Sequence, residues 1–274
     1  MAYQEHPKCE TPADEAVLWR YMDFTRFVDL LASRTLWFSR VDRLGDPREG
    51  LLTESEFNRL SKRSPDPASY FEKSRSLNFV NCWQQTDHEF MAMWDLYGAG
   101  GCGIAIRSTI GSLKTVVAST WFPIYVSKVE YVDWTRHDGD TENLIGMYVR
   151  KADGYIHESE VRLIVGDTVP EPFPLLSEEA PQGAAIDCER IARDVLGALA
   201  GFFPSCDFAT VDGRQLVLEA LAERRYCERL RRTPCGGRVS IDCDVLIHEV
   251  VVGPKAESWI LELARTVVKR CGSA

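Results

Sequence analysis

The segment from His157 to Val165 carries two carboxylates and a guanidinium at alternating positions, Glu158, Glu160 and Arg162. This pattern is typical of a β-strand, in which side chains two residues apart share a face and lie roughly 6–7 Å apart. The three charged groups are therefore predicted to project together, while the apolar residues between them face a core. Two interpretations stay open: a solvated outer face of a sheet, or a site where a carboxylate acts on a sugar or orients a ligand.

Two clusters nearer the N-terminus are candidates for the same site. Arg20 stands between Trp19 and Tyr21 in a short apolar segment. Its planar guanidinium suits an anion or a phosphate, although a surface arginine that packs its stem on an aromatic ring gives the same pattern. The run 46–50, which begins with Asp46, is first of all turn chemistry. Its carboxylates can also position a ribose hydroxyl or a metal.

A third cluster combines Trp83, Trp94 and Tyr97 and is followed by the glycine-rich run 98–103. Aromatic residues at helical spacing are usually core, but two indoles and a phenol beside a flexible segment can also hold a flat ring. The glycines lack the spacing of a phosphate-binding loop, which excludes a Rossmann or nucleoside-triphosphate motif. The five histidines show no metal-ligand spacing, and we expect no metal.

Composition narrows the class of protein. The 274 residues are 45% hydrophobic and 27% charged, as in ordinary globular proteins. No apolar run reaches the roughly 18 residues of a membrane helix and no signal-peptide pattern opens the chain, so we expect a cytoplasmic protein without a membrane partner. A net charge of −9 disfavours non-specific nucleic-acid binding. The nine cysteines are odd in number and unpaired in spacing, which indicates free thiols in a reducing compartment.

Hydrophobic periodicity and turn residues predict the elements that must position these groups. Strands are expected at 18–22, 35–39, 77–83, 104–107, 124–134, 160–167 and 245–252. Helices are expected after a cap at Asp23 or Thr25, and at 55–63, 68–76, 87–97, 111–117, 141–155, 187–199, 213–232 and 256–270. This irregular alternation predicts a flexible arm over 1–16 and one α+β domain over 17–274, with a mixed or antiparallel central sheet flanked by helices.

Five segments in this order resemble a bacterial family known only as a domain of unknown function, number twenty-nine seventy-one. They are Leu18-Trp19-Arg20-Tyr21; Leu36 to Ser39 leading to Asp46-Pro47 and Glu49-Gly50; Cys82 and Met93-Trp94 through Tyr97 to Gly103-Ile104; His157 to Ile164; and Val251 to Pro254. The resemblance covers most of the chain and implies little about activity.

The plan is more distantly similar to that of ADP-ribosyltransferases. That similarity implies that Arg20 contacts the cofactor NAD, that Glu160 is the catalytic glutamate, and that Glu158 is its helper. Loss of nicotinamide from NAD builds positive charge on the ribose, and a nearby carboxylate stabilises that charge in the transition state. The cofactor-binding residues on this interpretation are Arg20, Tyr21, Asp46, Trp83, Trp94, Tyr97 and Arg162.

Three hypotheses follow for the function. The first is an ADP-ribosyltransferase-like enzyme that acts on NAD or a related nucleotide in a toxin or anti-phage role, with a macromolecular acceptor that the sequence does not identify. The second is a magnesium-dependent hydrolase or nuclease with Asp46, Glu49, Glu158 and Glu160 as ligands. The third is a non-enzymatic ligand-sensing or protein-interaction module. The enzymatic interpretations require the acidic pair and Arg20 to open into one cleft.

Overall fold

The computed structural model describes residues 3–62, 74–76, 78–98, 101–118, 120, 123–137, 145–166 and 236–271. The proline-rich connection at 170–181 and the helices predicted at 187–199 and 213–232 lie outside the described residues. Of the helix predicted at 68–76, only 74–76 is described, and it is helical. The single domain predicted over 17–274 therefore stays a prediction.

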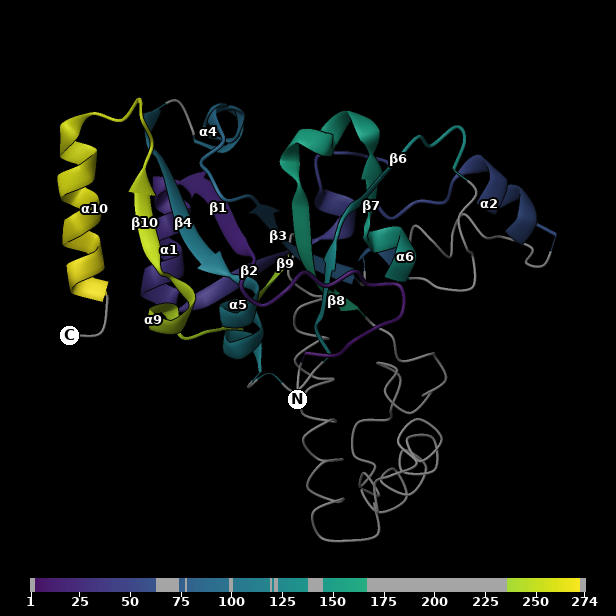
Figure 1. Ribbon diagram of the computed structural model, residues 1–274, viewed down its shortest axis with the longest axis horizontal. Coiled ribbons are helices and arrows are strands. Elements are labelled where there is room, and N and C mark those ends of the chain that lie inside the picture. The colour runs from purple at the N-terminus through teal and green to yellow at the C-terminus, as the bar shows by residue number, and fades with distance from the viewer. Residues whose placement is uncertain are drawn as a thin grey trace, which may run out of the picture. The chain divides into compact units, whose positions relative to one another are not determined.

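The described fold is built on an eight-stranded antiparallel sheet with helices against it (Figure 1). The strand order is β10-β4-β1-β3-β2-β9, and β8 pairs with both β3 and β5. The bounds are β1 Val17–Asp23, β2 Thr35–Arg40, β3 Asn78–Gln85, β4 Gly103–Thr109, β5 Tyr125–Lys128, β8 Glu160–Gly166, β9 Gly236–Ser240 and β10 Glu249–Val252. A separate parallel pair joins β6 Glu130–Val132 to β7 Arg150–Ala152. This confirms the predicted α+β class with a central antiparallel sheet.

Side-chain caps explain where several helices begin. Asp23 accepts a hydrogen bond from the Arg26 amide and starts α1, Phe24–Ser33, and Thr109 does the same for α5, Ile110–Val117. Thr53 forms a capping box at α2, Glu54–Leu60. The other helical elements are α4 Met91–Tyr97, α6 Ile145–Tyr148, α9 Cys243–Leu246, α10 Ser258–Cys271, and the 3₁₀ turns η1 Val41–Arg43 and η3 Asp153–Glu158. Helix α10 lies beside the edge strand β10 (Figure 1).

Strand β3 is the branch point of the sheet. Along one side it pairs with β8 from residue 78 to residue 84. On its other side, its C-terminal end pairs with β1 and its N-terminal end pairs with β2. Between these two contacts, the Asn81 side-chain amide donates to the Trp37 carbonyl at 2.7 Å. Strands β1 and β2 therefore separate from each other at the middle of β3.

Cross-strand register assigns the site residues to two faces of the sheet, because directly opposed residues point the same way. What we call the first face carries Glu160 and Arg162 of β8, their β3 partners Gln84 and Cys82, and Trp19, which is opposite Gln84. The second face carries the residues that alternate with these along the same strands. The first face is covered by two apolar clusters, one around α6 and one around α4. Helix α1 contacts β1, β2 and β4, and α5 contacts β4.

Three predicted elements have different boundaries. The strand predicted at 124–134 breaks after Lys128, since the Val129 amide bonds to Glu160 whereas the Glu130 amide bonds to Val149 and starts β6. The helix predicted at 141–155 is wrong: a single turn, α6, leads directly into β7 and η3. The strand predicted at 245–252 begins only at β10, after the short helix α9.

The described part of the predicted N-terminal arm is hydrogen-bonded along β5. The Gln4 amide bonds to the Ile124 carbonyl, the Glu10 amide bonds to Ser127 Oγ at 3.0 Å, and the Thr11 hydroxyl donates to the Val126 carbonyl at 2.6 Å. These bonds tie the segment to a sheet strand, where the sequence predicted a flexible arm. Among the described residues, the structure contains no helix that is long and apolar enough to cross a bilayer.

Candidate functional site

Arg162 and Glu160 lie on one face of β8, as their spacing predicted, and form a double hydrogen bond there. Arg162 Nε donates to Glu160 Oε1 at 2.6 Å and Nη2 donates to Oε2 at 3.0 Å. Two further N–H donors are used, because Nη1 donates to the Tyr148 carbonyl at 2.9 Å and Nη2 also bonds to Glu49. Arg162 is only 1% exposed. Such a bidentate pair fixes the orientation of both side chains.

Lys151 on β7 links a further carboxylate, Glu158, to Glu160. Its Nζ donates to Glu158 Oε2 at 2.5 Å and to Glu160 Oε2 at 3.1 Å, and it lies 3.7 Å from Glu49 Oε1. The neighbouring residue Arg150 holds β7 in place through a buried ion pair with Glu56 at 2.9 Å. Lys151 is therefore directed at the acidic residues by a strand that is fixed from its other side.

We call Glu49, Lys151, Glu158, Glu160 and Arg162 the ionic cluster. Each member is buried, with an exposed fraction of 7% or less. With all five ionised, the cluster has one carboxylate more than it has cations, so its net charge is −1. Buried groups of like sign are expected to share this excess unequally.

The pKa values of two members show how the charge is distributed. Burial acts to raise the pKa of Glu160, but the adjacent charge and hydrogen bonds of Arg162, with Lys151, outweigh it and lower the pKa to about 2. For Glu49, burial prevails over the attraction of Arg162, and the charge of Glu160 adds to it, so the pKa is raised. Glu160 is thus firmly ionised, and Glu49 is the member of this pair that takes a proton more readily.

Glu158 occupies the border of the ionic cluster. It ends the 3₁₀ turn η3, and Ser159 adopts a left-handed conformation with φ of 40° before β8 begins. Glu158 therefore does not lie in the predicted strand, although it still reaches Lys151. Its second oxygen, Oε1, has one long contact, 3.4 Å from the Tyr97 hydroxyl. Tyr97 is 39% exposed, so this oxygen lies between the buried ions and the surface.

Two predicted aromatic residues lie on the same side of the sheet as the ionic cluster. Tyr21 and Trp94 meet edge to face with ring centroids 4.9 Å apart, and both are buried with Trp19 and Met93. The Tyr21 hydroxyl accepts a hydrogen bond from the Phe90 amide at 3.0 Å, at the start of α4. These contacts fix α4, which presents Tyr97 to Glu158.

Arg20 and Trp83 lie on the second face, which corrects the predicted common cleft. Register places Trp83 opposite Val161 rather than beside Glu160, and Arg20 Cζ lies 5.8 Å from the Trp83 ring. Arg20 Nη2 reaches the Trp37 carbonyl at 3.4 Å, and Nη1 is buried without a hydrogen-bond partner among the described residues. Burial lowers the pKa of Arg20 to about 10. The strand parity of β1 relative to β8 is the reason that Arg20 and Glu160 do not share a cleft.

Asp46 belongs to the turn that delivers Glu49. Its Oδ1 accepts a hydrogen bond from the Arg48 amide at 2.9 Å, which is the local turn bond expected of this residue type. Asp46 is 5% exposed, and among the described residues it forms no hydrogen bond or ion pair with the ionic cluster. Three residues later, Glu49 enters the cluster directly. From the sequence, Glu49 was predicted only as one of the turn carboxylates that could position a ribose hydroxyl or a metal.

The geometry does not support the predicted magnesium set. Glu49, Glu158 and Glu160 converge, but their oxygens are already bonded to Lys151 and Arg162. Two protein cations thus occupy the positions that a divalent ion would need. Within the described ranges, no group of three or more histidine, cysteine or acidic side chains is arranged to hold a metal.

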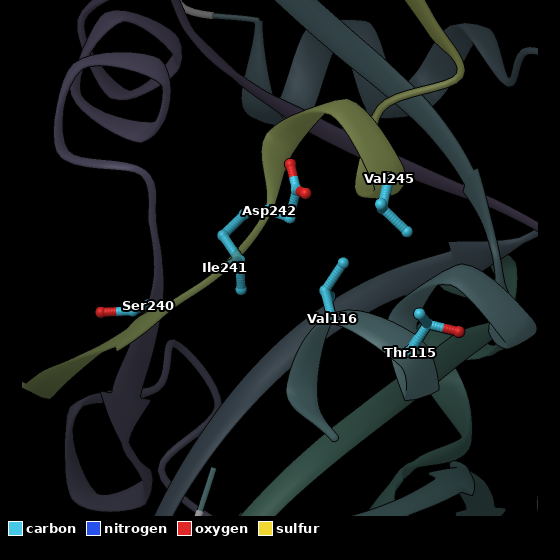
Figure 2. A pocket seen from close by; sticks show the side chains of 6 residues that line it. All are labelled: Thr115, Val116, Ser240, Ile241, Asp242 and Val245. Atoms are coloured by element: carbon cyan, nitrogen blue, oxygen red, sulfur yellow. The ribbon is translucent and has the colours of Figure 1, made fainter. Parts of the chain in front are cut away.

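A hollow of about 340 Å³ lies away from the ionic cluster, between α5 and the segment that enters α9 (Figure 2). Its lining consists of Thr115, Val116, Ser240, Ile241, Asp242 and Val245. Asp242 caps α9 and pairs with Arg34 at 2.9 Å. Asp242, the charged side chain among the six lining residues, is therefore already used in a helix cap and an ion pair. None of the predicted site residues lines the hollow.

Comparisons with protein-family models, with curated proteins and with solved structures found no match for this chain. The resemblance to the domain of unknown function and to the ADP-ribosyltransferase plan therefore stays a prediction. Function is therefore inferred from the geometry of the ionic cluster and its border.

Proposed function

We propose that the chain is an ADP-ribosyltransferase-like enzyme that acts on NAD or a related nucleotide at the border of the ionic cluster. The observation that carries this proposal is the position of Glu158. One of its oxygens is held by Lys151 at 2.5 Å, and the other faces the partly exposed Tyr97 at 3.4 Å. A carboxylate that is held on one oxygen and incompletely bonded on the other, beside a partly exposed side chain, can stabilise a developing positive charge.

The proposed reaction breaks the bond between the ribose C1′ and the nicotinamide nitrogen. Nicotinamide leaves with the bonding electron pair and becomes neutral, and positive charge develops on C1′ and the ring oxygen. Glu158 lies beside this charge, and an acceptor hydroxyl or amine then attacks C1′ and releases its proton. Because binding that strengthens in the transition state is what accelerates a reaction, a fixed carboxylate is more effective than a mobile one.

The other members of the cluster position Glu158 rather than touch the ligand. Glu160 receives hydrogen bonds on both oxygens from Arg162 and one from Lys151. The oxygens of Glu160 are thus less available to a ligand than those of Glu158. In this proposal Glu158 is the catalytic carboxylate and Glu160 a positioning residue, which reverses the roles that the resemblance implies.

The order of elements supports the same class. Strand β1 is followed by α1 and β2, and a later strand, β8, carries Glu160 soon after the turn η3 that ends at Glu158, and is separated from β1 by β3. We place the activity in the cytoplasm because the five described cysteines are free thiols. The proposal includes a toxin or anti-phage role and a macromolecular acceptor.

Nicotinamide release from NAD tests the proposal with three variants. Glu158→Gln is expected to lower turnover by about 10²-fold or more, the usual effect of removing one aligned electrostatic group. Glu249→Gln is the matched control, because it makes the same change on β10 at a surface pair with Arg107. Glu160→Gln is expected to lower both turnover and stability. Two results would contradict the proposal. One is that Glu158→Gln turns over NAD at the wild-type rate, and the other is that the wild type releases no nicotinamide.

A non-enzymatic ligand-sensing or interaction module is the second candidate. The observation that favours it is the charge compensation of the cluster, where each carboxylate has a cation partner and is at most 6% exposed. A sensor would bind a nucleotide and release it unchanged. Mass analysis of the ligand after incubation separates the two, because only an enzyme yields free nicotinamide.

A further inference from the structure

The ionic cluster holds more negative than positive charge, and the proposed reaction alone does not account for this excess. Three carboxylates, on Glu49, Glu158 and Glu160, share the two cations Lys151 and Arg162. Among the described residues, no further cation forms an ion pair with these carboxylates. An uncompensated charge in a buried site is unfavourable. It is removed either by a proton on one carboxylate or by a positive charge that a ligand supplies.

Glu49 is placed to hold the proton that neutralises the excess. It bonds to Arg162, and Lys151 Nζ lies 3.7 Å from its Oε1, but both cations also bind Glu160. Burial raises the pKa of Glu49 against the attraction of these cations, and the charge of Glu160 adds to the effect. The titratable groups around Glu49 are Glu160 and Arg162 of β8, Lys151 of β7, Cys82 of β3, Glu158 of η3 across Lys151, Asp46 and Arg48 of its own turn, and Arg75 and Tyr148 against the adjacent Gly50.

Glu49 and Glu158 are close enough for a charge at one to act on the other. Lys151 Nζ lies 2.5 Å from Glu158 Oε2 and 3.7 Å from Glu49 Oε1, so these two oxygens are within about 6 Å of each other. Glu158 Oε1, at the border, has only the 3.4 Å contact with the partly exposed Tyr97. A cation that meets this oxygen lies within roughly 12 Å of Glu49, where at an effective dielectric constant of about 20 it lowers the pKa of Glu49 by about one unit.

We propose that the site at Glu158 binds a positively charged ring and that this binding expels a proton from Glu49. The inference rests on the proposed function for the identity of the ligand, because the nicotinamide ring of NAD carries a positive charge and the ring of its reduced form carries none. When the charged ring binds, the Glu49 carboxyl group loses its proton to the buffer and remains as a carboxylate. Since the coupling is an equilibrium property, it requires no open path between Glu49 and the ligand.

The coupling gives the affinity for the charged ring a defined pH dependence. Below the raised pKa that Glu49 has in the free protein, the group is protonated, and binding has to displace the proton. The affinity therefore increases as the pH rises toward that pKa, and it is constant above it. A shift of one pKa unit corresponds to a rise of about 10-fold in affinity and, near the raised pKa, to the release of about half a proton for each ligand bound.

His157 is a second group at the border that can exchange protons. It is exposed and immediately precedes Glu158 in η3. Histidine commonly changes its charge between pH 5 and pH 8, and a cation that binds nearby displaces its proton as well. The inference assigns the released proton to Glu49, so a variant without the His157 imidazole has to retain the coupling.

Calorimetry with a matched pair of ligands tests the inference. Carbocyclic NAD has carbon in place of the ring oxygen of the nicotinamide ribose, so it resists cleavage and keeps its charged ring. Its dihydro form has a neutral ring and the same phosphates. The number of protons released is obtained from the binding enthalpy in buffers of different ionisation enthalpy, from pH 5 to pH 8. The proteins are the wild type, Glu49→Gln, His157→Gln and Glu249→Gln, the last of which makes the Glu49 change at the surface pair with Arg107.

The wild type is expected to release about half a proton with the charged analogue and none with the dihydro form. Glu49→Gln should release no proton, and its affinity for the charged analogue should be independent of pH and about 10-fold below that of the wild type at pH 8. Unchanged affinity of Glu49→Gln for the dihydro form shows that the variant is folded. His157→Gln and Glu249→Gln should behave as the wild type does.

Four results overturn the inference: proton release that persists in Glu49→Gln, its loss in His157→Gln, equal release with both analogues, or failure of the wild type to bind the charged analogue. If Glu49→Gln does not fold, the two analogues and His157→Gln still decide the outcome. Nicotinamide release from NAD is measured separately. Release of nicotinamide without proton coupling leaves only the proposed function, whereas proton coupling without nicotinamide release leaves only the inference.

Discussion

Replacement of Glu160 by glutamine gives a direct measure of how strongly the ionic cluster holds the fold. The pKa of Glu160 falls from its ordinary value of 4.5 to about 2 in the folded chain. At 1.36 kcal/mol per pKa unit, this difference corresponds to about 3 kcal/mol of stabilisation of the ionised form. We therefore expect Glu160→Gln to lower the free energy of unfolding by about 3 kcal/mol at pH 7.

The pH dependence of that difference identifies its origin. Because the folded pKa of Glu160 is depressed, its contribution is complete above pH 4.5 and is lost as the pH falls toward 2. The wild type should therefore exceed Glu160→Gln in stability at pH 7, and the two should converge near pH 2. Urea unfolding, followed by the fluorescence of the tryptophans, measures both quantities across this range.

Two results would refute the reasoning. If Glu160→Gln is as stable as the wild type at pH 7, the hydrogen bonds from Arg162 and Lys151 do not favour the ionised form. If the difference is present but constant from pH 7 to pH 2, it comes from packing and not from charge. Glu249→Gln, which removes a carboxylate from an exposed pair on the same sheet, is the control and should change stability little.

Three further predictions concern neighbouring groups. Glu49→Gln should be as stable as the wild type or more stable at pH 8, because the raised pKa of Glu49 makes its ionised form unfavourable above that pKa. The difference in stability should shrink as the pH falls. Urea unfolding at pH 8 and at a lower pH checks this. Arg150→Met should cost roughly 3–5 kcal/mol by leaving Glu56 buried without its cation, and Glu56→Gln combined with it should restore stability. Arg20→Met should leave NAD turnover within about threefold of the wild type, because Arg20 lies on the second face; a loss of turnover above tenfold would contradict that placement.

Local patterns in the sequence predicted the elements whose ends and faces are set by nearby residues. Strand β1, the Asp23 cap and helix α1 follow one another as expected. Helix α5, Ile110–Val117, begins one residue before the predicted range 111–117, at a cap formed by Thr109. The pairing of Glu160 with Arg162 also follows from local spacing, because both lie in β8. In each case the determining interaction spans four residues or fewer.

The rest of the site depends on contacts between distant parts of the chain. Lys151 was missed because its segment was predicted to be helical, and only pairing with β6 makes it part of β7. The separation of Arg20 from Glu160 depends on the register of β1 and β8 against β3. A shift of one residue would reverse it, and no pattern within a single strand specifies that register.

The ionic cluster is better explained by function than by stability. Replacing buried ion pairs with apolar residues of similar volume is often neutral or stabilising, so five buried charged groups are a poor way to strengthen a core. Apolar clusters lie on the same face around α6 and around α4, which shows that this face can be packed with hydrophobic residues. The excess of one carboxylate also imposes a cost that an apolar core avoids. What the charges provide is a fixed orientation for Glu158 beside the partly exposed Tyr97, which is the arrangement that the proposed reaction requires.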